Sequence, residues 1–219
     1  MLFVDLAIDA FSAFIFMLPV MILLPKYMKK QKVIAETLHK FGMALYVIII
    51  SVILTINGIP SLLHMQIDPN LNFIPFKDFT FNYPLYIESG VAFMFLGLLL
   101  PTFWRHNRSL KNTMLYGMAF SLFIEIMQIF CSRVTDINDL LFDAIGLCIG
   151  YFLFVALYYV KEDLFEHTCL RFRNRKRTSA LIRYEFILYM ILIFVVMFCV
   201  QSAIYTAIWD ILYKIALFN

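Results

Sequence analysis

The segment DLLFDAIGLCIGYFLFVALYYV, residues 139–160, decides the fold class of this chain. It carries no charged residue after Asp143, and its length matches the roughly 20 apolar residues with which an α-helix crosses the hydrocarbon core of a bilayer. With five comparable segments elsewhere, the sequence predicts an all-α, polytopic transmembrane bundle of about six spans in one domain, residues 1–219. The expected spans cover residues 6–25, 41–63, 85–104, 114–131, 139–160 and 184–209. The last segment stays apolar to Phe218, either as one long helix or as a span followed by an interfacial helix.

Composition also favours lipid as the solvent. Hydrophobic residues make up 63% of the 219 residues and charged residues 15%, whereas soluble domains carry roughly a quarter charged residues. A chain of this size has too little interior to hide so much apolar surface from water. A closed β-barrel, the other structure that spans a bilayer, needs alternating strands rather than continuous apolar runs. The net charge of +3 is small, and we expect no nucleic-acid partner.

Basic residues follow the first, third and fifth expected spans and are scarce after the others. Because cytoplasmic loops of membrane proteins are rich in Lys and Arg, this pattern predicts that both termini lie outside a bacterial plasma membrane. The run from Arg171 to Arg177 either sets this topology or binds anionic lipid head groups. The three segments hold fifteen of the 18 Lys and Arg: Lys26, Lys29, Lys30, Lys32, Lys40, Arg105, Arg108, Lys111, Lys161, Arg171, Arg173, Arg175, Lys176, Arg177 and Arg183.

Polar side chains gather on both sides of a short turn in SLFIEIMQIFCSRVTDINDLLFDAIGLCIG, residues 121–150. Spacings of i, i+4 and i+7 before the turn, and of i and i+4 after it, place them on one face of each helix. At 1.5 Å per residue, Glu125 lies ~9 Å and Asp143 ~6 Å below the outer ends of their helices. We therefore predict a pocket that opens outward. Its candidate catalytic residues are Glu125, Gln128, Arg133, Asp136, Asp139 and Asp143.

This cluster has two interpretations. It is either a functional pocket or a hydrogen-bonded polar knot that locks two helices, with Arg133 paired to Asp136. Buried carboxylates repel one another, which favours protonation or capture of a cation. Oxygen ligands suit a divalent cation, for which Glu125, Asp139 and Asp143 are the candidate ligands, although no spacing is diagnostic of a metal loop. The Gly146-x-x-x-Gly150 pair permits close helix packing, with the fourth predicted helix as the nearest partner.

The outer loop HMQIDPNLNFIPFKDFTFNYPLY, residues 64–86, is rich in proline and aromatic residues. Proline argues against a helix through it, and aromatic side chains favour the head-group layer of a bilayer. The loop is either an aromatic belt or a lid beside the acidic pocket. His64 is a lone histidine there, and we expect it to be structural.

Within this loop, Asn72-Phe73-Ile74-Pro75-Phe76 resembles the N-x-I-P-F signature of VanZ-like membrane proteins. The acidic cluster follows in the order and spacing of that family, so the resemblance covers about residues 50–160 and leaves the first and last spans outside. The chain departs from the family at Asp143, where the family commonly has Asn. It also departs at Ser89, because the span after the aromatic loop usually begins with Asn in the family. Phe95 also replaces a proline. We expect Asn72, Pro75 and Phe76 to contribute to substrate binding.

The resemblance implies a role in lowering susceptibility to lipophilic glycopeptide antibiotics of the teicoplanin type. The leading hypothesis is that the pocket acts on or masks an outer-leaflet or cell-wall component, with membrane lipids or a lipid-linked envelope molecule as partner. The alternative is an acid- or metal-assisted hydrolase or transferase on a lipid-linked substrate, with Glu125 as base. A transporter is less favoured, because the polar groups lie near one face rather than at the midplane. The oligomeric state is left open.

Overall fold

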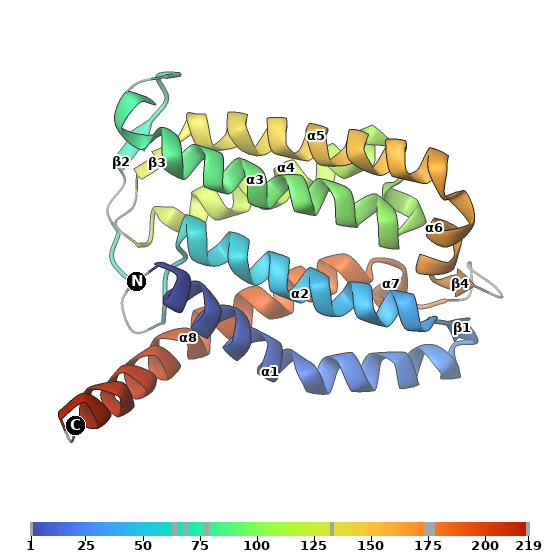
Figure 1. Cartoon of the computed structure of the whole chain (residues 1–219), viewed down its shortest axis with the longest axis horizontal. Coiled ribbons are helices and arrows are strands. Elements are labelled where there is room, and N and C mark those ends of the chain that lie inside the picture. Colours follow the sequence, from blue (N-terminus) through green and yellow to red (C-terminus); the bar gives the residue numbers. More distant parts are fainter. Residues whose placement is uncertain are drawn as a thin grey trace.

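The structure, a computed structural model, describes residues 2–62, 65–67, 70–76, 79–131, 134–172 and 178–217. Its long helices lie alongside one another in one bundle, and each runs opposite in direction to the next (Figure 1). The all-α fold is therefore confirmed. The helices are α1 (Leu2–Lys30), α2 (Thr37–Asn57), α3 (Phe79–Phe103), the 3-10 helix η1 (Arg105–Asn107), α4 (Leu110–Gln128), α5 (Ile137–Val160), α6 (Glu162–Thr168), α7 (Ala180–Arg183) and α8 (Glu185–Leu217).

Two short sheets mark the two ends of the bundle. β2 (Asn70–Asn72) pairs in parallel with β3 (Val134–Asp136), and the end that carries this sheet is called the β2–β3 end. β1 (Val33–Ile34) pairs antiparallel with β4 (Arg171–Phe172) at the opposite end, which is called the basic end. Helices α1, α3 and α5 finish at the basic end, where α2, α4 and α8 begin (Figure 1). The start of α1 and the finish of α8 therefore lie toward the β2–β3 end.

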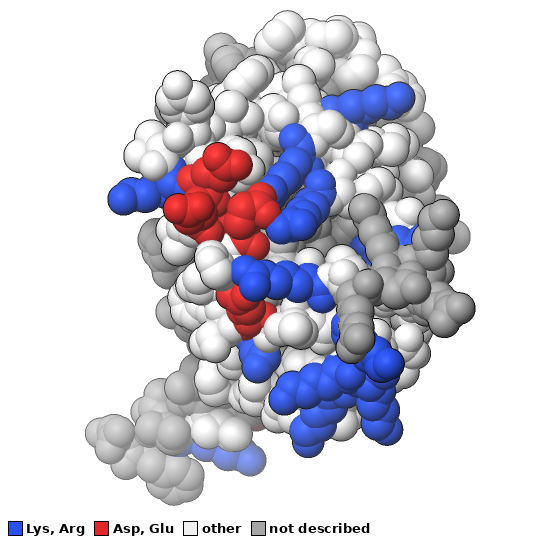
Figure 2. Space-filling model, turned by 90° about the vertical axis from the view of Figure 1, so that its right-hand side faces the viewer, with Lys and Arg blue, Asp and Glu red and all other residues white. Residues whose placement is uncertain are grey.

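Lysine and arginine side chains gather on the basic end, with a smaller group of acidic side chains among them (Figure 2). This follows from the fold, because the segments after α1, α3 and α5 all meet there. The clustering that the sequence predicted is therefore present among the described residues, whereas residues 173–177 lie outside them. The side of the membrane on which this end lies stays a prediction.

Four of the described helices are long and apolar enough to cross a bilayer. α4 does not reach the same mean hydropathy, since Lys111, Asn112, Glu125 and Gln128 interrupt it, and α8 is apolar over the part compared, Glu185–Val200. The count of six spans thus stays a prediction, although α4 and α8 lie in the same bundle. α8 is one continuous helix rather than a span with a separate interfacial helix. The four helices are Leu6–Lys30, Thr37–Asn57, Tyr83–Phe103 and Ile137–Val160.

The buried core lies between α1, α2, α3 and α8, and Tyr46, Phe93, Phe186 and Tyr189 are among its largest fully buried side chains. Large apolar side chains also cover the outside of the bundle; Phe11 is 66% exposed and Phe152 60%. In water such a surface would be unfavourable, whereas lipid tails solvate it. Both faces of the long helices are thus apolar, as a membrane location requires.

The glycine face of α5 packs against α3, which corrects the expected partner. A Cβ added at Gly146 would overlap the carbonyl oxygen of Gly90, and one at Gly150 would overlap that of Met94. In return, a Cβ at Gly97 of α3 would overlap the carbonyl oxygen of Leu147. Small residues on both helices let the two backbones touch, as in other membrane helix pairs. The sequence showed the close approach but not its partner, because chain order alone favoured the adjacent helix α4.

Candidate functional site

The contact between α3 and α5 places Asp143 opposite Ser89 near the β2–β3 end. Ser89 Oγ donates a hydrogen bond to Asp143 Oδ1 over 2.7 Å, and Ser121 Oγ of α4 donates to Oδ2 over 2.6 Å. Asp143 is 2% exposed, and both serines are buried. Ser89 Oγ also lies 3.2 Å from Oδ1 of Asn57, the last residue of α2. Polar groups from α2, α3, α4 and α5 therefore converge at the carboxyl group of Asp143.

Gln128 extends this cluster to the end of α2. Its Nε2 donates to the carbonyl oxygen of Asn57 over 3.0 Å, which satisfies a backbone group that the end of a helix leaves unpaired. Its Oε1 is buried and has no hydrogen-bond partner among the described residues. An unpaired acceptor of this kind is costly in a low-dielectric interior. Gln128 is therefore both a helix-end contact and a candidate acceptor for a ligand.

Glu125 and Asp136 hold the turn between α4 and α5. Glu125 Oε2 accepts a hydrogen bond from the backbone N–H of Asp136 over 3.0 Å, and Thr135 Oγ1 donates to the Glu125 carbonyl over 3.0 Å. Asp136 is the N-cap of α5, since its Oδ1 accepts from the Asn138 N–H, and Tyr86 Oη donates to its Oδ2 over 2.7 Å. These contacts match the polar-knot interpretation for both acids. The predicted partner Arg133 lies outside the described residues.

The loop with the N-x-I-P-F string lies directly against this turn. Through the pairing of β2 and β3, Asn72 stands opposite Asp136, and the Phe76 N–H donates to Asn138 Oδ1 over 2.8 Å. Asn72 Oδ1 accepts from the Ile74 N–H over 3.3 Å and so folds its own loop. Phe76 adopts a positive φ of 61°, which this hydrogen bond helps to hold.

The same loop presents apolar side chains to the outside. Phe73, Ile74 and Phe76 are each more than three-fifths exposed, and Pro75 is exposed as well. The two motifs thus meet at one end of the bundle, with polar groups buried beneath an apolar tip. His64 lies outside the described residues.

The carboxyl groups lie near one another without forming a metal-ligand group. Asp139, Asp143 and Asp136 lie within electrostatic range of Glu125, and Asp139 is half-buried at the first turn of α5. Among the described residues, no three His, Cys, Asp or Glu side chains come together as metal ligands would. Binding of a divalent cation by Glu125, Asp139 and Asp143 thus stays a prediction. The described residues do not bring these three carboxyl groups together as a set of metal ligands.

Comparison with known proteins agrees with this arrangement. The family model of VanZ/LLP1 matches residues 41–158, from the first turns of α2 to the last turn of α5, and so includes each residue of the site. The chain belongs to the VanZ/LLP1 family. It is also similar to the uncharacterized membrane protein YwnJ of Bacillus subtilis (strain 168), with 33% identity over 106 residues, 47% of this chain and 75% of that protein. No solved structure matches.

Several partners in this VanZ/LLP1 site were not predicted. Asn57, Tyr86 and Asn138 each contact a predicted site residue, and their positions follow only from the packing of α2 and α3 on α5. Asp9 of α1, buried beside Thr55 of α2 with a 3.0 Å hydrogen bond, is a further acid toward the same end. A polar residue inside an apolar segment was the available signal for Asn57 and Asp9.

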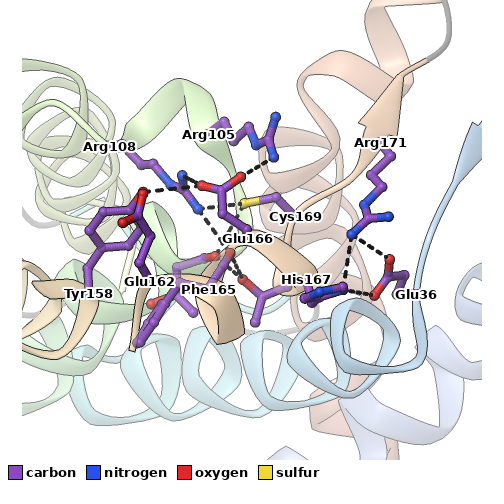
Figure 3. Close-up of polar contacts among 12 residues, drawn as sticks. Glu36, Arg105, Arg108, Tyr158, Glu162, Phe165, Glu166, His167, Cys169 and Arg171 are labelled. Atoms are coloured by element: carbon purple, nitrogen blue, oxygen red, sulfur yellow. Dashed lines mark hydrogen bonds and ion pairs between the residues drawn. The ribbon is translucent and has the colours of Figure 1, made fainter. Parts of the chain in front are cut away.

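A second polar network holds the basic end of this VanZ/LLP1 protein together. Glu166 of α6 lies between Arg105 and Arg108 and accepts hydrogen bonds from both (Figure 3). The Arg108 guanidinium lies 4.9 Å from the centre of the Tyr158 ring and donates to the Phe165 carbonyl. The hydrogen bond from Arg108 holds the pKa of Glu166 below its ordinary value, with the charge of Arg105 adding to the effect. This network fastens α6 to the segment between α3 and α4.

Separate contacts join other elements to this end. His167 and Arg171 both bind Glu36, just before α2 (Figure 3). His39 and Glu185 form a buried pair with 2.9 Å between Nε2 and Oε2, at the starts of α2 and α8. They cross-link elements that are distant in sequence, and we assign them a structural role.

Proposed function

We propose that this chain is an envelope membrane protein that lowers susceptibility to lipophilic glycopeptide antibiotics of the teicoplanin type. In this proposal the β2–β3 end acts on or masks an outer-leaflet or cell-wall component. The observation that carries the proposal is Asp143, a carboxyl group held by two serine hydroxyls below an exposed apolar loop. Family membership supplies the antibiotic class, and the excess of Lys and Arg at the opposite end supports the outward orientation.

The exposed loop and the buried polar groups at the β2–β3 end fit a lipid-linked target. Phe73, Ile74 and Phe76 provide apolar surface at the depth of lipid head groups, where aromatic side chains are favoured. Beneath them, buried polar atoms such as Gln128 Oε1 provide acceptors for hydroxyl or amide groups. A molecule with an acyl chain and a polar head would contact both kinds of surface. The physical basis for the proposal is the cost of burying polar groups within a membrane, because such groups are expected to serve a function.

Susceptibility and surface binding test this proposal together. Wild type, Asp143→Ala and Asp163→Ala are expressed in a susceptible bacterium that lacks the gene, and membrane levels are matched by immunoblotting. Asp163 is an exposed acid on α6, at the basic end, and serves as the control. We expect wild type and Asp163→Ala, but not Asp143→Ala, to reduce teicoplanin susceptibility and surface binding of labelled teicoplanin, with little effect on vancomycin. Equal susceptibility with and without the wild-type protein would reject the proposal.

An enzyme acting on a lipid-linked substrate is the second candidate, because acids within electrostatic range of one another suit acid–base chemistry. Glu125→Gln tests it cleanly, since the amide oxygen can still accept the Asp136 N–H while the charge is removed. If the protein is an enzyme, Glu125→Gln should lose the antibiotic phenotype while the amount of protein in the membrane stays the same. Full activity of this variant would leave only the masking role for the site.

A further inference from the structure

An apolar groove runs between α4 and α8 on the outside of the bundle. It has a volume of about 490 Å³ and is lined by Tyr116, Phe120 and Phe123 of α4 and by Ile187, Ile191 and Val195 of α8, among others. Its floor is formed by ring contacts between the two helices, such as Phe123 with Phe194 at 4.8 Å. The two helices otherwise pack mainly on other elements, α4 on α5 and α8 on α1 and α2. The groove is therefore a gap in the packing that lipid can enter.

The length of this groove matches one leaflet of a bilayer. Its walls run from Tyr116 to Phe123 and from Ile187 to Val195, which at 1.5 Å per residue is ~10–12 Å. Half of a hydrocarbon core of about 30 Å is ~15 Å. Both walls start near the basic end, since α4 begins at Leu110 and α8 at Glu185. The groove therefore starts on the basic side of the bundle and extends along α4 to about the depth of Ser121.

A positively charged hollow adjoins the basic end of the groove. It has a volume of about 220 Å³, and Arg105, His106 and Arg183 line it together with aromatic and aliphatic side chains; the described lining residues include no Asp or Glu. His106 Nε2 lies 3.1 Å from Tyr116 Oη, which lines the groove, so the hollow and the groove share a wall. Arg105 and Arg108 both pair with one carboxylate, that of Glu166, so these three residues together keep a net positive charge.

We propose that the groove binds an acyl chain of an anionic phospholipid whose phosphate lies against Arg105 and Arg183. The order of surfaces along the site, two arginines and then an apolar channel of one-leaflet length, is the order of groups along such a lipid. Arginine matches phosphate in geometry as well as charge. A second protein copy would fill the apolar channel but gives no reason for the arginines at its mouth. This site goes beyond the proposed function, and its charged mouth lies at the opposite end of the bundle.

Native mass spectrometry of the full chain in detergent tests the charge requirement. The protein is titrated with dioleoyl phosphatidylglycerol or with dioleoyl phosphatidylcholine, which have the same acyl chains. We expect phosphatidylglycerol to bind at least about fivefold more tightly than phosphatidylcholine. Arg105→Gln and Arg183→Gln should each lower the affinity for phosphatidylglycerol about fivefold, which is the effect of one basic residue at a membrane surface. Lys161→Gln removes a charge at the same end outside both surfaces and is expected to change the affinity less than twofold.

Two tryptophan variants test the groove itself. Ala119→Trp fills the groove and is expected to lower the affinity for both lipids at least about fivefold. Leu122→Trp adds the same ring on α4 outside the groove and is expected to leave the affinity unchanged. Arg105 is half exposed, so its variant remains informative if Arg183→Gln does not fold. Equal binding of the two lipids, an equal effect of Lys161→Gln, or unchanged binding by Ala119→Trp would overturn the proposal. Loss of a dimer in Ala119→Trp with lipid binding intact would assign the groove to a second copy instead.

Discussion

Ser89 on α3 donates a 2.7 Å hydrogen bond to Asp143 on α5, and both side chains are buried. These are two positions at which this chain departs from the asparagines common in VanZ-like proteins, so the two departures are in direct contact. A serine is shorter than an asparagine, and a carboxylate accepts a hydrogen bond from its hydroxyl. The pair keeps α3 and α5 connected while it adds an ionisable carboxyl group to the site.

Asp143→Asn should preserve both the fold and the antibiotic phenotype, because asparagine is common at this position in VanZ-like proteins. The amide can accept from Ser121 and donate to Ser89, which is then free to donate to Asn57, so every group keeps a partner. We expect the free energy of unfolding in detergent to change by less than about 1 kcal/mol. Thermal unfolding and teicoplanin susceptibility, measured on the same variant, check the two expectations.

Asp143→Ala is the companion variant to this substitution. It removes both serine contacts and leaves a cavity, which we expect to cost about 1–3 kcal/mol, since a membrane hydrogen bond contributes ~0.6–1.7 kcal/mol. An Asp143→Asn protein as unstable as Asp143→Ala would show that the charge itself holds the helices together.

The sequence was sufficient for the fold class and for the burial of three predicted site residues, because both depend on local patterns. Continuous apolar segments identified the helices, and the spacing of Glu125, Gln128 and Asp143 placed them on inward faces that the structure confirms as buried. The N-x-I-P-F loop and the turn before α5 were expected at the same end, and β2 and β3 join them.

The remaining features depend on which helices are neighbours, which local patterns do not encode. Chain order favoured α4 as the partner of the glycine face of α5, and only the packed bundle shows that the partner is α3. For the same reason two contacts were missed: that of Asn57 with Gln128, 71 residues away in sequence, and that of Tyr86 with Asp136, 50 residues away. The roles of Glu125 and Asp136 in holding the turn depend on backbone N–H directions that no spacing reveals.

Alanine substitutions along the α3–α5 contact should destabilise in a defined order. A Cβ at Gly146 or Gly150 overlaps a backbone carbonyl oxygen of α3, which cannot move without the helix, so we expect a cost of about 1–3 kcal/mol or more. At Gly90 the added Cβ would lie 3.1 Å from the Phe142 carbonyl oxygen, and a small shift suffices. Thermal unfolding should therefore rank Gly90→Ala as the mildest of the three. The reverse order would contradict the packing of α5 on α3.

The His39–Glu185 pair should respond differently to single and double substitutions. Both ring nitrogens of His39 face acceptors, Glu185 Oε2 and the Thr168 carbonyl, each at 2.9 Å, as a protonated ring would require. His39→Leu alone leaves Glu185 buried without this partner, and we expect a loss of about 3–5 kcal/mol. His39→Leu combined with Glu185→Met removes both charges and should restore most of that loss.

The double-mutant cycle is measured by denaturant or thermal unfolding in detergent. Trp104 Nε1 also donates to Glu185 over 3.3 Å, so Trp104→Phe gives the separate cost of that hydrogen bond. Additive effects of the two single substitutions would show that the pair contributes through packing alone.

The Glu166 network should make stability depend on pH in the acidic range. The hydrogen bond from Arg108 holds the pKa of Glu166 below 4.5 in the folded protein. A carboxyl group whose folded pKa is lowered stabilises the fold above its unfolded pKa, and this contribution disappears as the pH falls through the folded pKa. The melting temperature of wild type should therefore exceed that of Glu166→Gln at pH 7, and the difference should shrink as the pH falls below about 4.5. Glu162→Gln, an exposed neighbour on α6, is the control and should follow wild type. A difference between wild type and Glu166→Gln that stays constant from pH 7 to pH 3 would show that the carboxylate charge is not what fastens α6 to Arg105 and Arg108.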